Sequence, residues 1–171
     1  MKTIEMEFAL ANYLDYRQNL IVFNPSWGLY VGRKIMHECD ILILSQTGYA
    51  TEIEIKISKA DLMKDQKKKH GHDHPYIKQL WFAVPEELEE IALAEIPDRA
   101  GLYVVTKKHV ESFVGVGYKF PSRNEFKVKI IRRPKANTSA PKWSDLERYQ
   151  LARLGAIRAV FLKQKLMELK S

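Results

Sequence analysis

The sequence predicts an α/β protein with a central mixed β-sheet and helices on both faces. Residues 39–58 read as a hairpin, because two strand-like runs flank the five-residue connection 45–49. Two apolar runs, 79–84 and 101–106, enclose a helical segment, which is the pattern of a βαβ unit with parallel strands and a right-handed crossover. An antiparallel hairpin joined to a parallel pair makes the sheet mixed.

The first half of the chain supplies the elements around the hairpin. Apolar residues recur with helical spacing over residues 3–14, where Thr3 is the expected N-cap. A short strand follows at 20–23. After the hairpin, Ser58 and Asp61 have the spacing of a capping box, which predicts a Lys-rich helix to about residue 69.

The second half supplies the edge of the sheet and a long helix. The segment 85–97 is a helix entered by Pro85 and stopped by Pro97, and its neighbours Trp81 and Phe82 are expected in the core. Residues 107–125 have no clear periodicity, and residues 126–131 alternate like a strand with one solvated face. A second capping box, Ser144 to Glu147, opens a helix that runs to about residue 169. Trp143, just before it, is expected to act as a hydrophobic staple, with base stacking as the alternative.

The charge of this 171-residue chain is distributed unevenly. Its net charge is +7, yet residues 1–118 carry 14 Lys and Arg against 17 acids, whereas residues 119–171 carry 14 against four. We expect an α/β domain over 1–136, with 137–171 forming a basic linker and helix packed on it. The surplus indicates a polyanionic partner such as nucleic acid, and the alternative is a solvated basic helix.

Several classes of protein are disfavoured by what the sequence lacks. No segment approaches about 18 consecutive apolar residues and acids interrupt the first 14, so we expect no membrane span, no secretion and a cytoplasmic location. The single cysteine, Cys39, excludes an internal disulfide and a Cys-based zinc site. Phosphate-binding glycine loops and Ser–His–Asp patterns are also missing.

The hairpin carries the residues with the clearest chemistry. With a loop at 45–49, residue 42 pairs with 52, and Asp40 faces Glu54 at a Cβ separation of roughly 4.5–5.5 Å. Glu52, Glu54 and Lys56 share one face of the second strand. Two facing carboxylates require a proton or a bound cation, and their oxygens suit Mg²⁺ or Mn²⁺.

Lys56 completes a set that could hydrolyse a phosphodiester. It lies two residues along the same face, close enough to orient or deprotonate a metal-bound water. The alternative is a solvated strand face with an ordinary Glu–Lys pair. The first helix offers a further acid: Glu7 falls within its apolar arc, whereas Glu5 falls on its polar side, and the choice between them stays open.

Asp40 followed by Glu54-Ile55-Lys56 resembles the signature of the PD-(D/E)xK nuclease superfamily. The predicted order of elements over about 3–84 resembles the α-β-β-β-α-β core of that restriction-endonuclease-like fold. The flanking segments 52–70, 80–88 and 101–105 are similar to MmcB-like DNA-repair nucleases and related phage-type proteins. One departure is Cys39, which precedes Asp40 where the motif has Pro.

The resemblance implies a role for each matching residue. Asp40 and Glu54 would be ligands of Mg²⁺ or Mn²⁺, Lys56 the catalytic lysine, and Glu7 the acid from the first helix. The function expected is metal-dependent hydrolysis of DNA by a deoxyribonuclease in repair, recombination or phage DNA processing. A domain with one such site often needs two copies to cut both strands, so a homodimer is left open.

Two other sets of residues support DNA contact or competing functions. Basic side chains near the predicted site would attract the phosphate backbone, and their alternative is a solvated surface. They are Lys64, Lys67, Lys68, Lys69, Arg132 and Arg133. A cluster of potential zinc or nickel ligands lies at His70, His72, Asp73 and His74. The rival functions are therefore a nucleic-acid-binding module without activity and a zinc- or nickel-binding protein.

Overall fold

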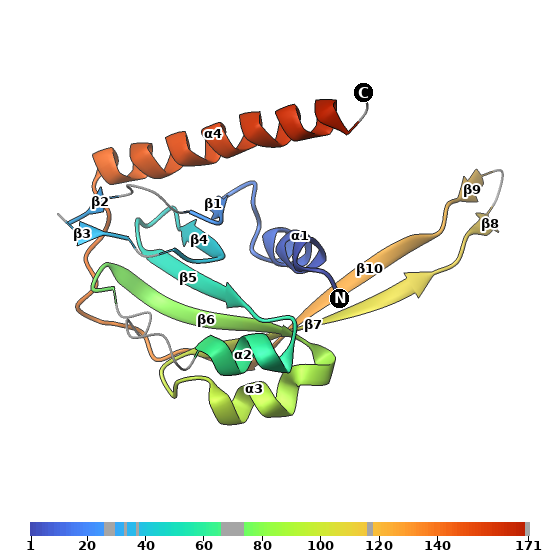
Figure 1. The fold of residues 1–171 in the computed structure, drawn as a ribbon, viewed down its shortest axis with the longest axis horizontal. Coiled ribbons are helices and arrows are strands. Elements are labelled where there is room, and N and C mark those ends of the chain that lie inside the picture. The colour runs from blue at the N-terminus through green and yellow to red at the C-terminus, as the bar shows by residue number, and fades with distance from the viewer. Residues whose placement is uncertain (26–29, 33, 37, 66–73, 116–117, 170–171) are drawn as a thin grey trace.

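The fold is built on a six-stranded mixed sheet with the strand order β1-β4-β5-β6-β7-β10 (Figure 1). The computed structural model describes residues 1–25, 30–32, 34–36, 38–65, 74–115 and 118–169. The strands are β1 (Leu20–Phe23), β4 (Ile41–Leu44), β5 (Ala50–Ile55), β6 (Ile77–Pro85), β7 (Gly101–Val110) and β10 (Arg123–Arg132). β5, β6 and β7 run parallel, while β1, β4 and β10 pair antiparallel with their neighbours. The predicted mixed α/β sheet is confirmed.

Within the described residues, four helices accompany the sheet in an order that matches the sequence prediction. They are α1 (Thr3–Tyr13), α2 (Lys59–Asp65), α3 (Glu89–Glu95, after a 3-10 turn at Glu86–Leu88) and α4 (Asp145–Glu168). Helix, three strands, helix and strand follow one another as α1, β1, β4, β5, α2 and β6. A small hairpin of β2 (Tyr30–Val31) and β3 (Lys34–Ile35) is inserted between β1 and β4.

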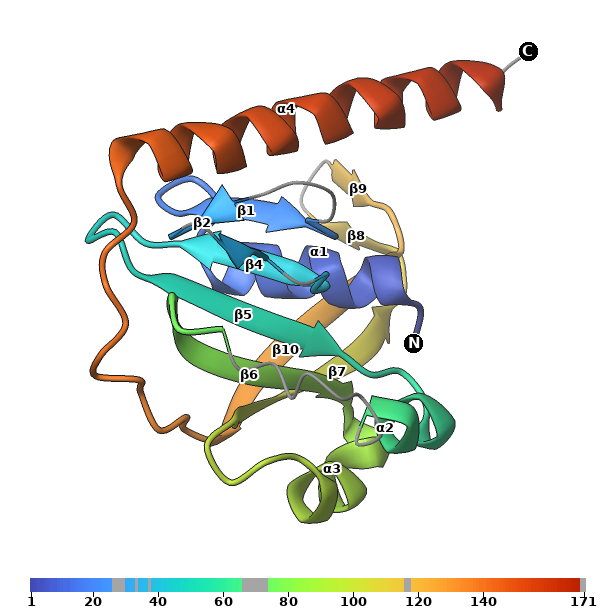
Figure 2. The same cartoon turned by 60° about the vertical axis from the view of Figure 1, so that its left-hand side comes forward.

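The helices cover both faces of the sheet (Figure 2). Met6 and Leu10 of α1 pack on one face, against apolar side chains such as Ile53 and Trp81. The opposite face carries two clusters, one beneath α2 and α3 and one beneath the β2–β3 hairpin and α4. Alternating side chains of one strand therefore enter different cores.

Helix α4 begins at the predicted capping box. The Ser144 hydroxyl accepts from the Glu147 amide, and the Glu147 carboxylate accepts from the Ser144 amide at 2.7 Å. Leu151 of α4 is buried against the sheet. Trp143 is also buried and its indole N–H donates to the Tyr76 carbonyl at 3.1 Å, so its ring belongs to the core and is not an exposed platform for base stacking. No helix in the described ranges is long and apolar enough to cross a membrane.

Two elements differ from the sequence prediction. The N-cap of α1 is Lys2 rather than Thr3, and Ile4 and Phe8 are 69% and 61% exposed because the helix packs through Met6, Ala9 and Leu10. The segment 107–125, which shows no periodicity, extends β7 and β10 into a long hairpin with β8 (Phe113–Gly115) and β9 (Tyr118–Phe120) at its far end.

Candidate active site

The β4–β5 register brings Asp40 and Glu54 together as predicted. Ile41 pairs with Ile53 and Leu42 with Glu52, so the next position along places Asp40 opposite Glu54. Asp40 stands just before β4, and its Oδ2 accepts a hydrogen bond of 2.7 Å from the amide of Ile55. This bond continues the pairing beyond the regular ladder and fixes the carboxylate over β5.

One face of β5 is charged although it lies inside the protein. Glu52, Glu54 and Lys56 are 0%, 2% and 4% exposed, on the face opposite α1. The Lys56 Nζ lies 2.7 Å from Glu54 Oε2, and its backbone amide donates to the Ala83 carbonyl at 3.0 Å. Because water is largely excluded here, charges interact more strongly than they would at the surface. Burial of this kind argues against the simpler interpretation of a solvated Glu–Lys pair.

Asn24, immediately after β1, connects the elements around the site. Its backbone φ of 46° is left-handed, a conformation that Asn tolerates better than most residues. The Asn24 amide donates to the Asp40 carbonyl at 2.7 Å, and its side-chain amide donates to Glu7 Oε1 at 3.1 Å. Its own carbonyl accepts from the Arg158 guanidinium of α4. This role of Asn24 was not predictable from the sequence, because all three partners are distant along the chain.

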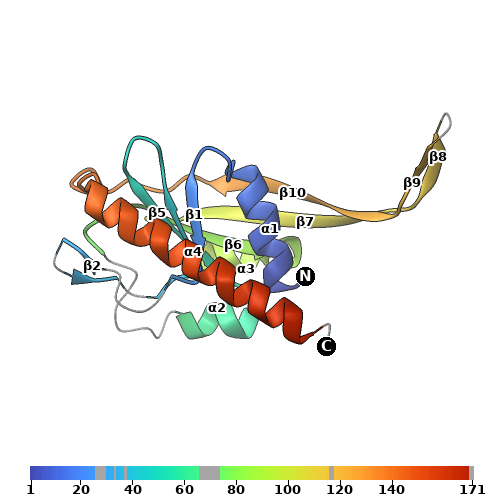
Figure 3. The ribbon, with the colours of Figure 1, turned by 90° about the horizontal axis from the view of Figure 1, so that it is seen from above.

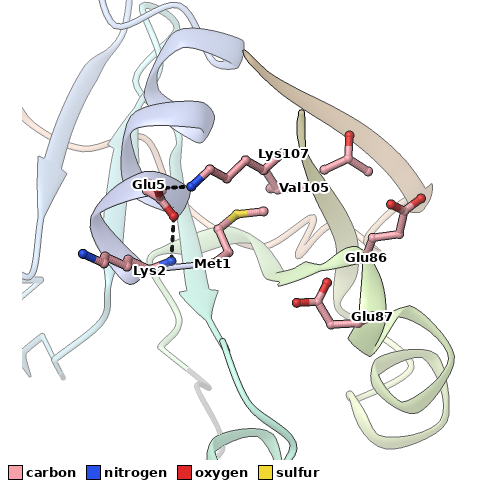
Figure 4. A pocket seen from close by; sticks show the side chains of 8 residues that line it. Met1, Lys2, Glu5, Glu86, Glu87, Val105 and Lys107 are labelled. Carbon is pink, nitrogen blue, oxygen red and sulfur yellow. Dashed lines mark hydrogen bonds and ion pairs between the residues drawn. The ribbon is translucent and has the colours of Figure 1, made fainter. Parts of the chain in front are cut away.

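Glu7, rather than Glu5, is the acid of α1 that faces Asp40. Burial raises the pKa of Glu7; the bond from Asn24 lowers it, and the charge of Asp40 raises it further. Glu5 lies in a separate pocket of about 480 Å³ beside Glu86 (Figure 4). There its Oε1 pairs with Lys107 Nζ at 2.6 Å, a bond that, together with the Lys2 amide, lowers the pKa of Glu5.

Cys39 lies beside the carboxylates as an uncharged thiol. Burial raises its pKa well above 9.0, and the negative charges of Glu52, Glu54 and Asp40 raise it further. The influence of Glu52 shows that a third acid belongs to this neighbourhood. Alternation along β5 placed Glu52 on the correct face, but nothing in the motif distinguished it as part of the site.

Asp40 and Glu54 are the residues of this site that could hold a divalent cation. Mg²⁺ prefers oxygen ligands and is commonly held by one or two carboxylates, with waters and substrate phosphate completing its shell. Asp40 and Glu54 provide two carboxylates on one face of the hairpin. A cluster of three or more His, Cys, Asp or Glu in metal-binding geometry does not occur among the described residues. Carboxylate oxygens are of the ligand type that suits Mg²⁺ or Mn²⁺.

The candidate DNA-binding residues lie in different surroundings. Lys64 is exposed in the last turn of α2 and Arg133 is exposed after β10, whereas Lys67, Lys68 and Lys69 lie outside the described residues. Arg132 donates to the carbonyls of Ala100, Pro97 and Ile96 at 2.9, 2.8 and 3.4 Å. Its guanidinium therefore fastens β10 to the loop between α3 and β7.

The histidine segment is described only at its end. His70, His72 and Asp73 fall outside the described residues. His74 is buried, and its Nδ1 accepts from the Tyr76 amide at 3.3 Å. This hydrogen bond holds the His74 ring in the turn before β6.

Comparison with known proteins supports the fold alone. No family model matches the chain, and no curated protein matches it. One solved structure is similar, the SPO1766 protein of unknown function from Silicibacter pomeroyi, with 19% sequence identity and a TM-score of 0.55. The match covers 97% of this chain and 91% of that one. The similarity therefore extends over almost the whole chain.

Proposed function

We propose that this protein is a metal-dependent nuclease that hydrolyses phosphodiester bonds of DNA at Asp40, Glu54 and Lys56. The observation that carries the proposal is the meeting of Asp40 with Glu54 across the β4–β5 hairpin, together with the buried contact between Glu54 and Lys56. An acidic pair with an adjacent lysine meets the demands of phosphodiester hydrolysis. The resemblance of Asp40 and Glu54-Ile55-Lys56 to the sequence signature of PD-(D/E)xK nucleases supports the same assignment.

Each residue has a distinct part in this proposal. Asp40 and Glu54 hold Mg²⁺ or Mn²⁺, which when bound supplies charge stabilisation and an acidified water. Lys56 orients the attacking water and offsets negative charge at the phosphate. Glu7, linked to Asp40 through Asn24, supports the acidic pair from α1.

Cleavage assays test the proposal directly. Linear, nicked and branched DNA are incubated with the protein and Mg²⁺ or Mn²⁺, and products are followed on denaturing gels. We expect cleavage that requires metal, is lost in Asp40→Asn and in Lys56→Gln, and is retained in Asp98→Asn. Asp98 is an exposed aspartate between α3 and β7. Asp98→Asn therefore makes the same chemical change as Asp40→Asn at a position outside the site.

The outcomes separate the proposed function from its main rival. A protein that binds DNA but cleaves none of these substrates is a nucleic-acid-binding module instead. Cleavage that survives Lys56→Gln contradicts the role given to the lysine. Gel filtration with light scattering, with and without DNA, reports whether cutting involves a homodimer.

A further inference from the structure

The hairpin of β7 and β10 continues well beyond the sheet. β6 pairs with β7 only from Gly101 to Val105, whereas the pairing of β7 with β10 continues to Val110 and Arg123. Residues 106–110 and 123–127 therefore form a ribbon, which we call the arm, whose two strands pair with no third strand of the described residues. At about 3.4 Å per residue it spans about 17 Å. The arm projects from the body in two views at right angles (Figures 1 and 3).

The two faces of the arm differ in character. Phe126 belongs to the face towards α1, where its ring meets the Phe8 ring edge-to-face at a centroid distance of 6.3 Å. The opposite face carries Lys127 next to Thr106, and Lys108 next to Glu125. Both lysines are exposed. This face is therefore polar and mainly basic.

The charge of the basic face is only partly neutralised. Arg123 pairs with Glu125 at 2.7 Å. Lys129 lies on the same face, two residues after Lys127 and outside the arm, and its Nζ lies 4.0 Å from a carboxylate oxygen of Glu86. Lys108 and Lys127 form no ion pair with any residue in the described part of the chain.

The arm begins at the same edge of the sheet as the candidate active site. β5, β6 and β7 are parallel, so their carboxyl ends lie at one edge. Glu54 and Lys56 stand at the end of β5, and the arm is the continuation of β7 past that edge (Figure 1). The register from Glu54 through Phe82 to Leu102 places the basic face of the arm on the same side of the sheet as Glu54.

We propose that the arm docks duplex DNA, with its basic face in the major groove and Lys108 and Lys127 on the backbone phosphates. The major groove admits a two-stranded β-ribbon, and lysines that neutralise phosphates release counterions. The choice of DNA as the polyanion rests on the proposed function. A duplex held in this way is presented to the edge of the sheet where Asp40 and Glu54 lie.

The experiment compares two double variants that remove the same charges. Lys108→Thr/Lys127→Thr alters the arm and keeps residues that favour strands. Lys135→Thr/Lys142→Thr alters exposed positions in the linker between β10 and α4, which runs along the side of the molecule away from the arm (Figure 1). Affinity for a fluorescent 20-base-pair duplex is measured by anisotropy in EDTA over a range of salt concentrations, with circular dichroism to verify folding.

A plot of log K against log salt has a negative slope, and we expect this slope to become shallower by about two in the arm variant, roughly 0.9 for each lost phosphate contact. In the linker variant we expect the slope to stay unchanged. The proposal is overturned if the slope is unchanged in the arm variant, if it becomes equally shallower in both variants, or if the unaltered protein does not bind the duplex. Equal affinity for a single strand of the same length overturns docking in a groove.

Binding in EDTA separates the arm from the chemistry. If the arm-dependent binding is found but no DNA is cleaved in metal, the arm proposal holds and the nuclease proposal fails. If DNA is cleaved and the arm variant binds like the unaltered protein, only the arm proposal fails.

Discussion

The Lys56 ammonium lies 2.7 Å from Oε2 of Glu54, and both groups are almost completely removed from water. Burying two charges is costly, and their attraction offsets the cost only while both are present. By contrast, the Lys107–Glu5 pair has a similar distance, 2.6 Å, but lies at the surface. The buried pair is therefore an expensive arrangement for stability alone, which is consistent with a role in chemistry.

Replacing Lys56 with Met should destabilise the protein by about 3–5 kcal/mol, because the Glu54 carboxylate loses its ammonium partner inside the protein. Adding Glu54→Gln should restore part of the loss. Urea unfolding of both single variants and the double variant gives the coupling. Lys107→Met is the matched control at the exposed pair and should have a much smaller effect. Strictly additive losses at Glu54 and Lys56 would show that the pair is not coupled.

Substitution by Met should reduce stability much more at Arg132 than at Arg133. Arg132→Met removes donors from the carbonyls of Ala100, Pro97 and Ile96, and should cost about 1–3 kcal/mol of unfolding free energy. Arg133 is exposed, so Arg133→Met should change stability by no more than about 0.5 kcal/mol. Chemical denaturation measures both. Equal stability of the two variants would refute the structural role of Arg132.

Glu147 should make the attachment of α4 dependent on pH. Partial burial raises its pKa, but hydrogen bonds from Ser144 and from the Gly32 amide outweigh burial and lower the pKa below 4.5. A lowered pKa means that the carboxylate stabilises the folded state above about pH 4.5, and that this stability is lost as the pH falls through the folded pKa.

The Glu147→Gln variant should therefore be less stable than the unaltered protein at neutral pH, and the difference should shrink below pH 4.5. Thermal unfolding followed at several pH values between 3 and 7 measures the difference. A gap between the two proteins that is constant over this range would contradict the assignment.

The hairpin and its register were predictable because the signals are local. Five loop residues between two apolar runs determine which residues face each other, and the structure confirms Leu42 opposite Glu52. The parallel pair of β6 and β7 was predictable for a similar reason, since a short helix between two apolar strands requires a crossover.

The arm and the surroundings of Asp40 were not predictable in this way. A ribbon without a buried face has no hydrophobic alternation, so residues 107–110 and 123–125 carry no strand pattern even though they pair regularly. Asn24 meets Glu7, Asp40 and Arg158 only after α1, β4 and α4 have assembled. Such contacts depend on tertiary packing rather than on spacing in the sequence.

The proposed nuclease activity depends on the binding of a divalent ion to Asp40 and Glu54, and titration calorimetry with Mn²⁺ or Mg²⁺ tests this binding without knowledge of the DNA substrate. We expect a binding heat for the unaltered protein that is lost in Asp40→Asn and in Glu54→Gln and kept in Asp98→Asn. Unchanged binding in all three variants, or no binding by the unaltered protein, would contradict it.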